Sequence, residues 1–165
     1  MSSYTQILYQ IIFSTKNRAK VLINEENRLI LYKYIWGVIK NKNCYLYRIN
    51  GVEDHIHILT NLHPSIALSD LVKDIKVSSS IMIKKKNLFP KFKGWQIGYG
   101  AFTYSIDAKE NLIKYIMNQK THHHKETFID EFTRILNDSD IKYDRKYLVV
   151  PEKSGNTQNS YKKRK

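Results

Sequence analysis

The stretch "GVEDHIHILT", residues 51–60, decides the fold, because its second half alternates in the way a β-strand does. Side chains alternate between the two faces of a strand, so Ile56 and Ile58 point one way while His55 and His57 point the other. The isoleucines can pack against helices, and we predict that the histidines lie on the opposite, uncovered face of the sheet. Their rings are then separated by roughly 6–7 Å, given a rise of ~3.3 Å per residue.

The elements on either side place this strand in a four-stranded sheet. Residues 45–50 form a hairpin with it across Gly51. Residues 4–13 predict a central strand, because apolar side chains occupy both of its faces, and residues 96–105 predict a fourth strand. Apolar stripes predict helices over 24–41 and 64–86. The order strand, helix, strand, strand, helix, strand fits an α+β, ferredoxin-like (RRM-like) antiparallel sheet with two helices on one face.

Helical patterns continue beyond the fourth strand. We predict a C-terminal helix over 107–123, which carries Tyr115, and a further helix from about residue 127. Residues 1–150 are expected to form a single domain. Residues 151–165 are polar and basic, which predicts a disordered tail.

The net charge of the chain indicates which classes of partner it binds. It carries 28 Lys and Arg against 15 Asp and Glu, a net charge of +13, which favours a polyanionic partner such as nucleic acid or an anionic membrane. No apolar run is long enough to span a bilayer, and the N-terminus lacks the pattern of a signal peptide. Cys44 is the only cysteine, which excludes an internal disulfide and a CxxC metal site. We therefore expect a cytoplasmic protein without a membrane partner, associated with the nucleoid when DNA is bound.

The histidine pair and the third helix both carry groups suited to chemistry on a phosphate. Two imidazoles on one strand face can converge on a divalent ion, or they can be surface or hydrogen-bonded histidines without a ligand. At about 100° per residue, Tyr115, Gln119 and His122 share an arc beside the apolar stripe of the helix. An amide oxygen suits Mg²⁺ or Mn²⁺, and a tyrosine hydroxyl can attack a phosphodiester.

Each of these helix residues also has a purely structural interpretation. A tyrosine beside an apolar stripe is commonly a packing residue, and Gln119 can simply be solvated. The run His122–His124 can supply metal ligands, or it can hydrogen-bond the last carbonyls of the helix. Spacing alone leaves these alternatives open.

Several separated motifs, in the same order, make the chain resemble the single-tyrosine HUH transposases of the insertion-sequence 200/605 family. They are "FSTKNR" at 13–18, "GVEDHIHIL" at 51–59, "LSDLVKDIKVSSS" at 68–80, "WQIGYGAF" at 95–102 and "YIMNQKTHHHKETFIDEF" at 115–132. The resemblance implies that His55 and His57 are metal ligands, Gln119 the third ligand and Tyr115 the nucleophile. No departure is found at these four positions.

The resemblance also implies an activity. Such a transposase cleaves and rejoins single-stranded DNA at insertion-sequence ends, by metal-assisted transesterification through a 5′-phosphotyrosine intermediate. The implied cofactor is Mg²⁺ or Mn²⁺, and the implied partners are hairpin-bearing single-stranded DNA and a second copy of the chain in a homodimer. No nucleotide cofactor is expected, since the sequence has no GxxxxGK[ST] loop.

Basic and aromatic side chains suit contact with unpaired DNA. Our candidates are Lys16, Arg18, Lys73, Lys76, Lys84, Lys85, Lys86, Trp95 and Tyr99. Gly98 and Gly100 either admit a nucleic-acid backbone or mark a bulge. Three rival interpretations remain: a non-catalytic nucleic-acid-binding module, a metal-dependent phosphodiesterase that uses water, and a small-ligand enzyme, against which the charge argues.

Overall fold

The protein is described here by a computed structural model, which describes residues 3–148. Its four strands form one sheet in the order β2-β3-β1-β4, in which all neighbouring strands are antiparallel. The strands are β1 (Tyr9–Ser14), β2 (Leu46–Gly51), β3 (His55–Thr60) and β4 (Gly100–Thr103). The predicted α+β architecture with a central first strand is confirmed.

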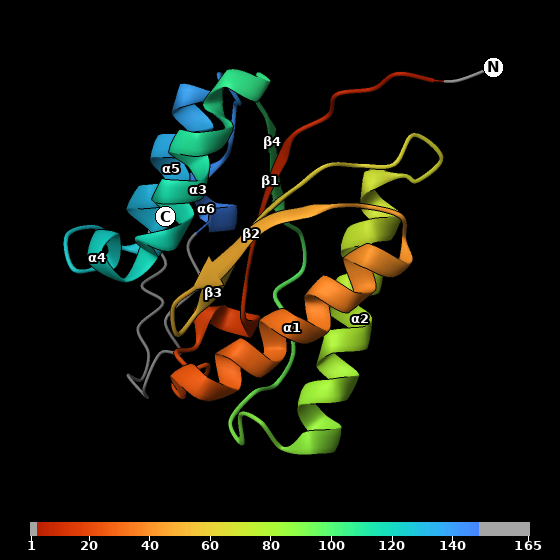
Figure 1. Cartoon of the computed structure of the whole chain (residues 1–165). Helices are drawn as coiled ribbons and strands as arrows, with labels where there is room; N and C mark the ends of the chain where they lie inside the picture. Colours follow the sequence, from red (N-terminus) through yellow and green to blue (C-terminus); the bar gives the residue numbers. More distant parts are fainter. Residues whose placement is uncertain (1–2, 149–165) are drawn as a thin grey trace, which may run out of the picture.

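Two long helices cover one face of the sheet (Figure 1). Helix α1 (Glu25–Asn41) begins after Asn24, which is its N-cap. The Asn24 side chain accepts a hydrogen bond from the Asn27 backbone N–H at 2.9 Å. Helix α2 (Leu68–Lys86) ends at Asn87, which adopts a left-handed conformation. Together with the sheet they bury the main core, which includes Ile11, Phe13, Leu31, Ile35, Ile56, Ile58, Leu71 and Ile75.

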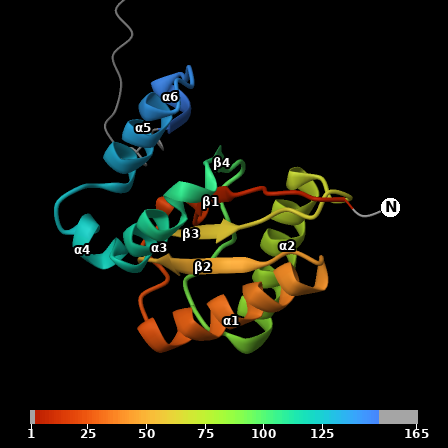
Figure 2. The ribbon, with the colours of Figure 1, turned by 45° about the horizontal axis from the view of Figure 1, so that its top comes forward.

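A second helical layer covers the opposite face of the sheet (Figure 2). It contains α3 (Lys109–Met117), α4 (Gln119–His123), α5 (Phe128–Asp138) and α6 (Arg145–Leu148). The prediction that this face is uncovered is wrong. The opposite face is covered because Leu8, Ile12 and Leu59 place apolar side chains on it. Leu8 and Leu59 pack against Ile116, and Ile12 packs against Ile135.

The predicted helix over 107–123 is divided in two. A 3-10 turn, η2 (Ile106–Ala108), leads into α3, and the chain leaves helical geometry at Asn118 before α4 begins. Asn50 of β2 donates hydrogen bonds to the carbonyls of Ile116 and Met117, at 2.9 and 3.1 Å. These bonds satisfy carbonyls that the ending helix leaves free, and they attach the helix carrying Tyr115 to the sheet.

The fourth strand is shorter than the predicted range of 96–105. Before Gly100 the β-pairing is reduced to an isolated bridge between Trp95 and Thr15, the residue that follows β1. Gly98 has a φ of 86°, which ends regular strand geometry. The Lys76 ammonium donates hydrogen bonds to the carbonyls of Gln96, at 2.9 Å, and Gly98. Residues 96–99 therefore form a loop that precedes β4.

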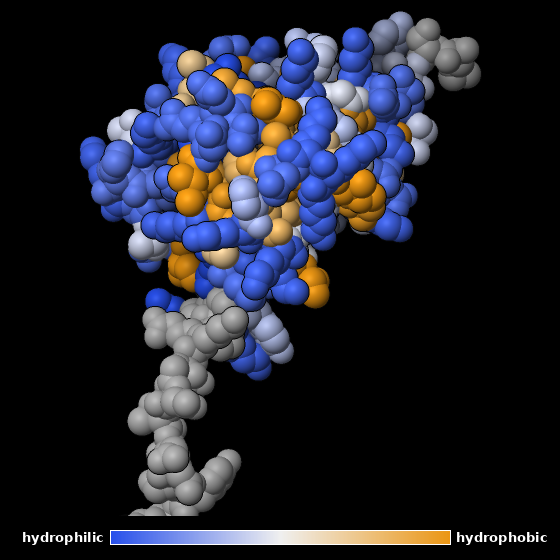
Figure 3. Space-filling view, turned by 90° about the horizontal axis from the view of Figure 1, so that it is seen from below, coloured by the Kyte–Doolittle hydropathy of each residue, from blue (hydrophilic) through white to orange (hydrophobic). Residues whose placement is uncertain are grey.

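The surface seen from below Figure 1 shows apolar patches crossed by hydrophilic side chains (Figure 3). Exposed apolar residues on the two long helices include Leu29, Trp36, Val77 and Ile81. Within residues 3–148, no helix combines the length and apolarity needed to cross a bilayer. The tail predicted over 151–165 lies outside the described residues, and the single domain over 1–150 stays a prediction.

Candidate active site

The two histidines of β3 lie side by side beneath the second helical layer. Their ring centroids are 5.2 Å apart, and both side chains are fully buried. The register places His55 opposite Ser14 of β1 and His57 opposite Ile12. Directly paired residues share a face, so these four side chains project from the same face of the sheet.

A hydrogen bond at Nδ1 orients each of the two imidazole rings. His55 Nδ1 lies 2.7 Å from Asp54 Oδ1, and His57 Nδ1 lies 3.0 Å from the Gln10 amide nitrogen. The Tyr104 hydroxyl in turn donates to Gln10 Oε1 at 2.9 Å. Each ring is thus held through Nδ1 and turns Nε2 towards another partner. At His55 the Nδ1–H donates to a carboxylate, the arrangement found behind metal-binding histidines, whereas His57 Nδ1 accepts from the Gln10 amide.

That other partner is Glu131, a fully buried carboxylate on α5. Its Oε1 lies 2.8 Å from His57 Nε2, 3.4 Å from His55 Nε2 and 3.3 Å from His123 Nε2. We call the set His55, His57, His123 and Glu131 the histidine cluster. A buried carboxylate is tolerable only with such partners, so the cluster holds α5 against the sheet.

The charges of the cluster are strongly coupled. Burial by itself would raise the pKa of Glu131, but the adjacent imidazoles of His123, His55 and His57 outweigh it and hold that pKa well below its usual range. Burial lowers the pKa of His57 to about 4, against the opposing effect of Glu131. Burial also lowers the pKa of His55, but the hydrogen bond to Asp54 and the nearby Glu131 carboxylate raise it above its usual value. The cluster therefore favours an ionised carboxylate beside a neutral His57.

Tyr115 reaches the same carboxylate from α3. Its hydroxyl donates a hydrogen bond to Glu131 Oε2 and accepts one from Arg134 Nη2 at 3.1 Å. Arg134 is itself held by Glu126 through two bonds of 3.0 Å. Burial, and then the contact with Glu131, raises the pKa of Tyr115. The tyrosine hydroxyl thus stands between a proton acceptor and a cation.

Gln119 is also fully buried at this point, at the start of α4. Its amide nitrogen lies 3.4 Å from Glu131 Oε2, and its Oε1 lies 3.2 Å from His123 Nε2. The structure therefore brings together all four residues for which the sequence predicted chemistry, His55, His57, Tyr115 and Gln119.

The residues present fit a divalent metal ion. The ligand atoms of the histidine cluster all lie within 4.8 Å of one another. Within residues 3–148, His55 Nε2 is one of two buried side-chain polar atoms that lack a hydrogen-bond partner. A buried nitrogen aimed at a carboxylate without a full hydrogen bond is a ligand position for a cation. Three imidazoles and one carboxylate are also a common donor set for divalent transition metals.

Sequence reasoning missed Glu131 as a member of this site and left His123 undecided. A signal for Glu131 was present, because it stands on the apolar side of its helix, three residues after Phe128 and four before Ile135. An acidic residue on the apolar side of a helix is expected to be buried with a hydrogen-bonding or charged partner. Nothing in the sequence indicated which partner it would meet.

The predicted DNA contacts are distributed unevenly. Arg18 and Tyr99 line one pocket beside the histidine cluster. Trp95 packs edge-on against Phe13, and its indole N–H donates to the Ser79 hydroxyl at 3.0 Å. The Lys76 ammonium is hydrogen-bonded to the Gln96 and Gly98 carbonyls. Four exposed lysines, Lys73, Lys84, Lys85 and Lys86, lie on α2, in the layer opposite the cluster, and Lys16 is exposed at the turn after β1. The contact roles of all nine residues stay predictions.

Comparisons with known proteins give a consistent result. A family model described as "Transposase IS200 like" matches residues 3–119. A crystal structure of a Deinococcus radiodurans R1 protein assigned as a transposase is similar with a TM-score of 0.55, at 25% identity, over 72% of this chain and 95% of that one. The structure of a REP-associated tyrosine transposase bound to a REP hairpin is similar with a TM-score of 0.56, at 18% identity, over 97% and 100%, which shows a common fold. No curated protein sequence gives a significant match.

Proposed function

The chain belongs to the IS200-like transposase family, and on that premise we propose that it cleaves and rejoins single-stranded DNA through a covalent bond between phosphate and Tyr115. One observation carries this proposal: the Tyr115 hydroxyl and both strand histidines meet on a single buried carboxylate. A nucleophile beside a proton acceptor, next to a fitted cation site, is the arrangement that phosphoryl transfer to a side chain requires.

The two oxygens of Glu131 suit two different tasks. Oε1 faces the three histidines, whereas Oε2 faces the Tyr115 hydroxyl and the Gln119 amide. In this proposal Oε1 belongs to the cation site and Oε2 accepts the proton of the nucleophile. One carboxylate thereby couples the position of the tyrosine to that of the histidines.

The ligands of a divalent ion would be His55, His57, His123 and Glu131, with Gln119, the third ligand implied by the resemblance, adjacent to them. When bound, such an ion supplies polarisation of a non-bridging phosphate oxygen and neutralises developing charge. Of the two predicted cofactors, a set with three imidazoles suits Mn²⁺ better than Mg²⁺, which prefers oxygen ligands.

The protein's own residues perform the remaining work of the cleavage step. Because its pKa is raised, Tyr115 keeps its proton at neutral pH and needs an acceptor, and Glu131 Oε2 is within hydrogen-bond reach. As the tyrosine oxygen attacks, a bond from oxygen to phosphorus forms and the bond from phosphorus to the 3′ oxygen breaks. The leaving 3′ oxygen takes up the proton that Tyr115 gave to Glu131 Oε2, so that it departs as a hydroxyl and Glu131 returns to the ionised form that its lowered pKa favours. Arg134, 3.1 Å from the tyrosine oxygen, stabilises the negative charge that develops there.

The bond energy is kept in the phosphotyrosine, so attack by another 3′ hydroxyl rejoins DNA without a nucleotide cofactor. The substrate we propose is single-stranded DNA with a hairpin, supported by the net charge of +13 and by the hairpin bound to the REP-associated relative. One tyrosine carries one strand end, so moving an element calls for two sites and a homodimer. In this structure Tyr115 lies at the histidines of its own chain.

A denaturing gel tests the proposal. Labelled single-stranded DNA from both flanks of the gene is incubated with the protein and Mn²⁺ or Mg²⁺, with EDTA, or with Tyr115→Phe. We expect a metal-dependent, slower-migrating protein–DNA band that disappears entirely in Tyr115→Phe. Tyr45→Phe is the matched control, because Tyr45 is exposed and lies beside Thr60, at the end of β3 far from His55, and it should keep the band.

Two outcomes would contradict the proposal. Tight DNA binding without a covalent band under any metal would favour the non-catalytic module. Cleavage that survives in Tyr115→Phe would make water the nucleophile and would favour a metal-dependent phosphodiesterase.

A further inference from the structure

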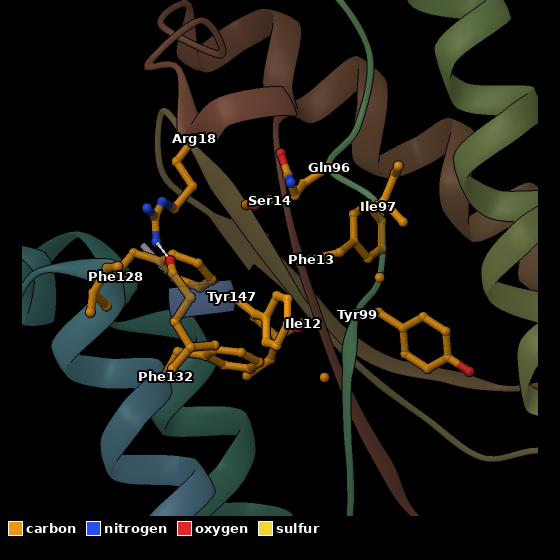
Figure 4. A pocket seen from close by; sticks show the side chains of 14 residues that line it. Ile12, Phe13, Ser14, Arg18, Gln96, Ile97, Tyr99, Phe128, Phe132 and Tyr147 are labelled. Atoms are coloured by element: carbon orange, nitrogen blue, oxygen red, sulfur yellow. Dashed lines mark hydrogen bonds between the residues drawn. The ribbon is translucent and has the colours of Figure 1, made fainter. Parts of the chain in front are cut away.

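A cavity of about 160 Å³ opens next to the histidine cluster, between the 96–99 loop and the helices α5 and α6. We call it the aromatic pocket and define it by six of its lining residues, Ile12, Ser14, Ile97, Tyr99, Phe132 and Tyr147. In Figure 4, Phe132 and Tyr147 face the hollow from one side, and Ile97 and Tyr99 stand on the other.

The aromatic pocket shares a sheet face and a wall with the cluster. Its floor residues Ile12 and Ser14 are the direct cross-strand partners of His57 and His55. Phe128 lines the pocket, and its ring centroid lies 4.4 Å from that of His55. One aromatic ring therefore separates the pocket from the cluster.

The walls of the pocket suit a flat aromatic ligand. A Cβ atom added to Gly100 would lie 2.5 Å from Phe132, so glycine at this position allows the phenylalanine ring to lie over β4. Beside Phe132, Tyr147 is 80% exposed, and on the other side of the pocket Ile97 is 96% exposed. Apolar side chains left in water around a hollow gain most from a ligand that offers a π-face.

The rim carries a small number of polar groups. The Arg18 guanidinium donates to the Leu148 carbonyl (Figure 4), and burial lowers its pKa, against the opposing effect of Asp54. The Gln96 side chain lines the same rim, and its Oε1 accepts a hydrogen bond from the Asn17 backbone N–H at 2.8 Å. An apolar slot with a cation and an amide at its edge is the pattern of a small-ligand site that also reads hydrogen-bonding groups.

We infer that the aromatic pocket binds one unpaired base of the DNA strand, next to the phosphate that lies at the histidine cluster. This inference rests on the proposed function, which supplies the strand. A base offers a π-face for Tyr147 and Phe132 and a polar edge for Gln96, and its phosphate suits a protein of net charge +13. The pocket then sets which bond Tyr115 meets, because it holds the nucleotide beside that bond.

The first test is a titration of ¹⁵N-labelled full chain in EDTA, followed by amide NMR. The probes are dAMP, dGMP, dCMP and dTMP, with 2-deoxyribose 5-phosphate as the probe that lacks a base. We expect saturable shifts of the Gly98 and Gly100 amides with at least one nucleotide and none with the sugar phosphate. Tyr147→Ala should weaken binding by about 5–150-fold, the usual effect of losing one stacking partner.

The matched control is Tyr45→Ala, which removes an exposed tyrosine at the other end of β3 and should leave binding unchanged. The inference is overturned if the two glycine amides do not respond, if they respond equally to the sugar phosphate, or if Tyr147→Ala binds like the wild type.

A second test uses the covalent-adduct gel. Replacing a single base beside the cleaved phosphate with an abasic site should slow adduct formation in the wild type, and should have no added effect in Tyr147→Ala. The two proposals fail separately. Base-selective NMR shifts without an adduct would contradict the phosphotyrosine mechanism, whereas an adduct that tolerates every abasic site would contradict the base site alone.

Discussion

The two faces of β3 are equally buried, yet they bury opposite kinds of side chain. Ile56 and Ile58 point into the apolar core beneath α1 and α2, and His55 and His57 point into a polar cluster beneath α3 and α5; all four have no exposed surface. Apolar groups need only neighbours of suitable shape, whereas buried polar groups need directed partners. One strand thus separates a face that stabilises the fold from a face that carries the proposed active site.

The two faces also differ in how they are held. The α1–α2 face has one continuous apolar core, whereas the other has two small apolar clusters and the histidine cluster. On that face the position of α5 depends on Glu131 and its histidine partners as well as on Ile135 and Leu136. A change on the first face should therefore affect stability, and a change on the second should affect metal binding and pH dependence.

The largest effect on stability is expected from Ile58→Ala on the apolar face. Removing this fully buried side chain should lower the free energy of unfolding by about 2–5 kcal/mol, measured by urea denaturation. Ile81→Ala, at an exposed position on α2, is the matched control and should stay within about 0.5 kcal/mol of the wild type. If folded Ile58→Ala also lost Mn²⁺ affinity, the functional separation of the two faces would be disproved.

The same contrast explains how far the sequence could predict the structure. Alternation in 55–60 predicts which face each side chain occupies, because it depends only on the strand itself. The site forms only where β3 packs against α5. These two elements are far apart in sequence, and their packing is set by tertiary contacts that a local pattern does not show. Glu131 could be suspected from its apolar helix side, but its contact with His57 could not. The uncovered-face prediction failed for a related reason, since Ile12 and Leu59 were apolar on that face and required a second layer.

The next effect concerns pH in the metal-free protein. The pKa of His57 is lowered to about 4, chiefly by burial, from 6.5 in the unfolded chain. Between pH 4 and 6.5 the unfolded chain binds a proton that folded His57 does not, so stability rises with pH across this window. The full shift corresponds to a loss on the order of 3 kcal/mol as pH falls from 6.5 to 4. His55, whose pKa is raised, acts oppositely and lowers stability as pH rises above 6.5.

Urea unfolding in EDTA at pH 4.5, 5.5, 6.5 and 7.5 measures this dependence. Stability should be greatest near pH 6.5, and His57→Asn should flatten the acid side of the profile. His124→Asn, at an exposed position, should leave the profile unchanged. An unaltered acid limb in His57→Asn would assign the pH dependence to groups outside the histidine cluster.

The smallest expected effect in free energy is the most informative about the functional face. Glu131→Gln keeps the size of the side chain but removes the negative charge that lies within 3.4 Å of three imidazoles. We expect the Mn²⁺ affinity of the DNA-free protein, measured by titration calorimetry, to fall by about 10–100-fold, equivalent to about 1.4–2.8 kcal/mol. Glu110→Gln, an exposed change in the first turn of α3, should leave that affinity unchanged.

The adduct gel on the same variant separates the two tasks of Glu131. If Glu131→Gln loses both Mn²⁺ affinity and the covalent band, the carboxylate serves the cation through Oε1 and the tyrosine through Oε2. If the band is lost while Mn²⁺ affinity is kept, Glu131 serves Tyr115 alone, and the cation belongs to His55, His57 and Gln119. In that case the cation site would consist of residues that strand alternation and helix spacing had already indicated. The metal affinity of the histidine face of β3 would then not depend on its contact with α5.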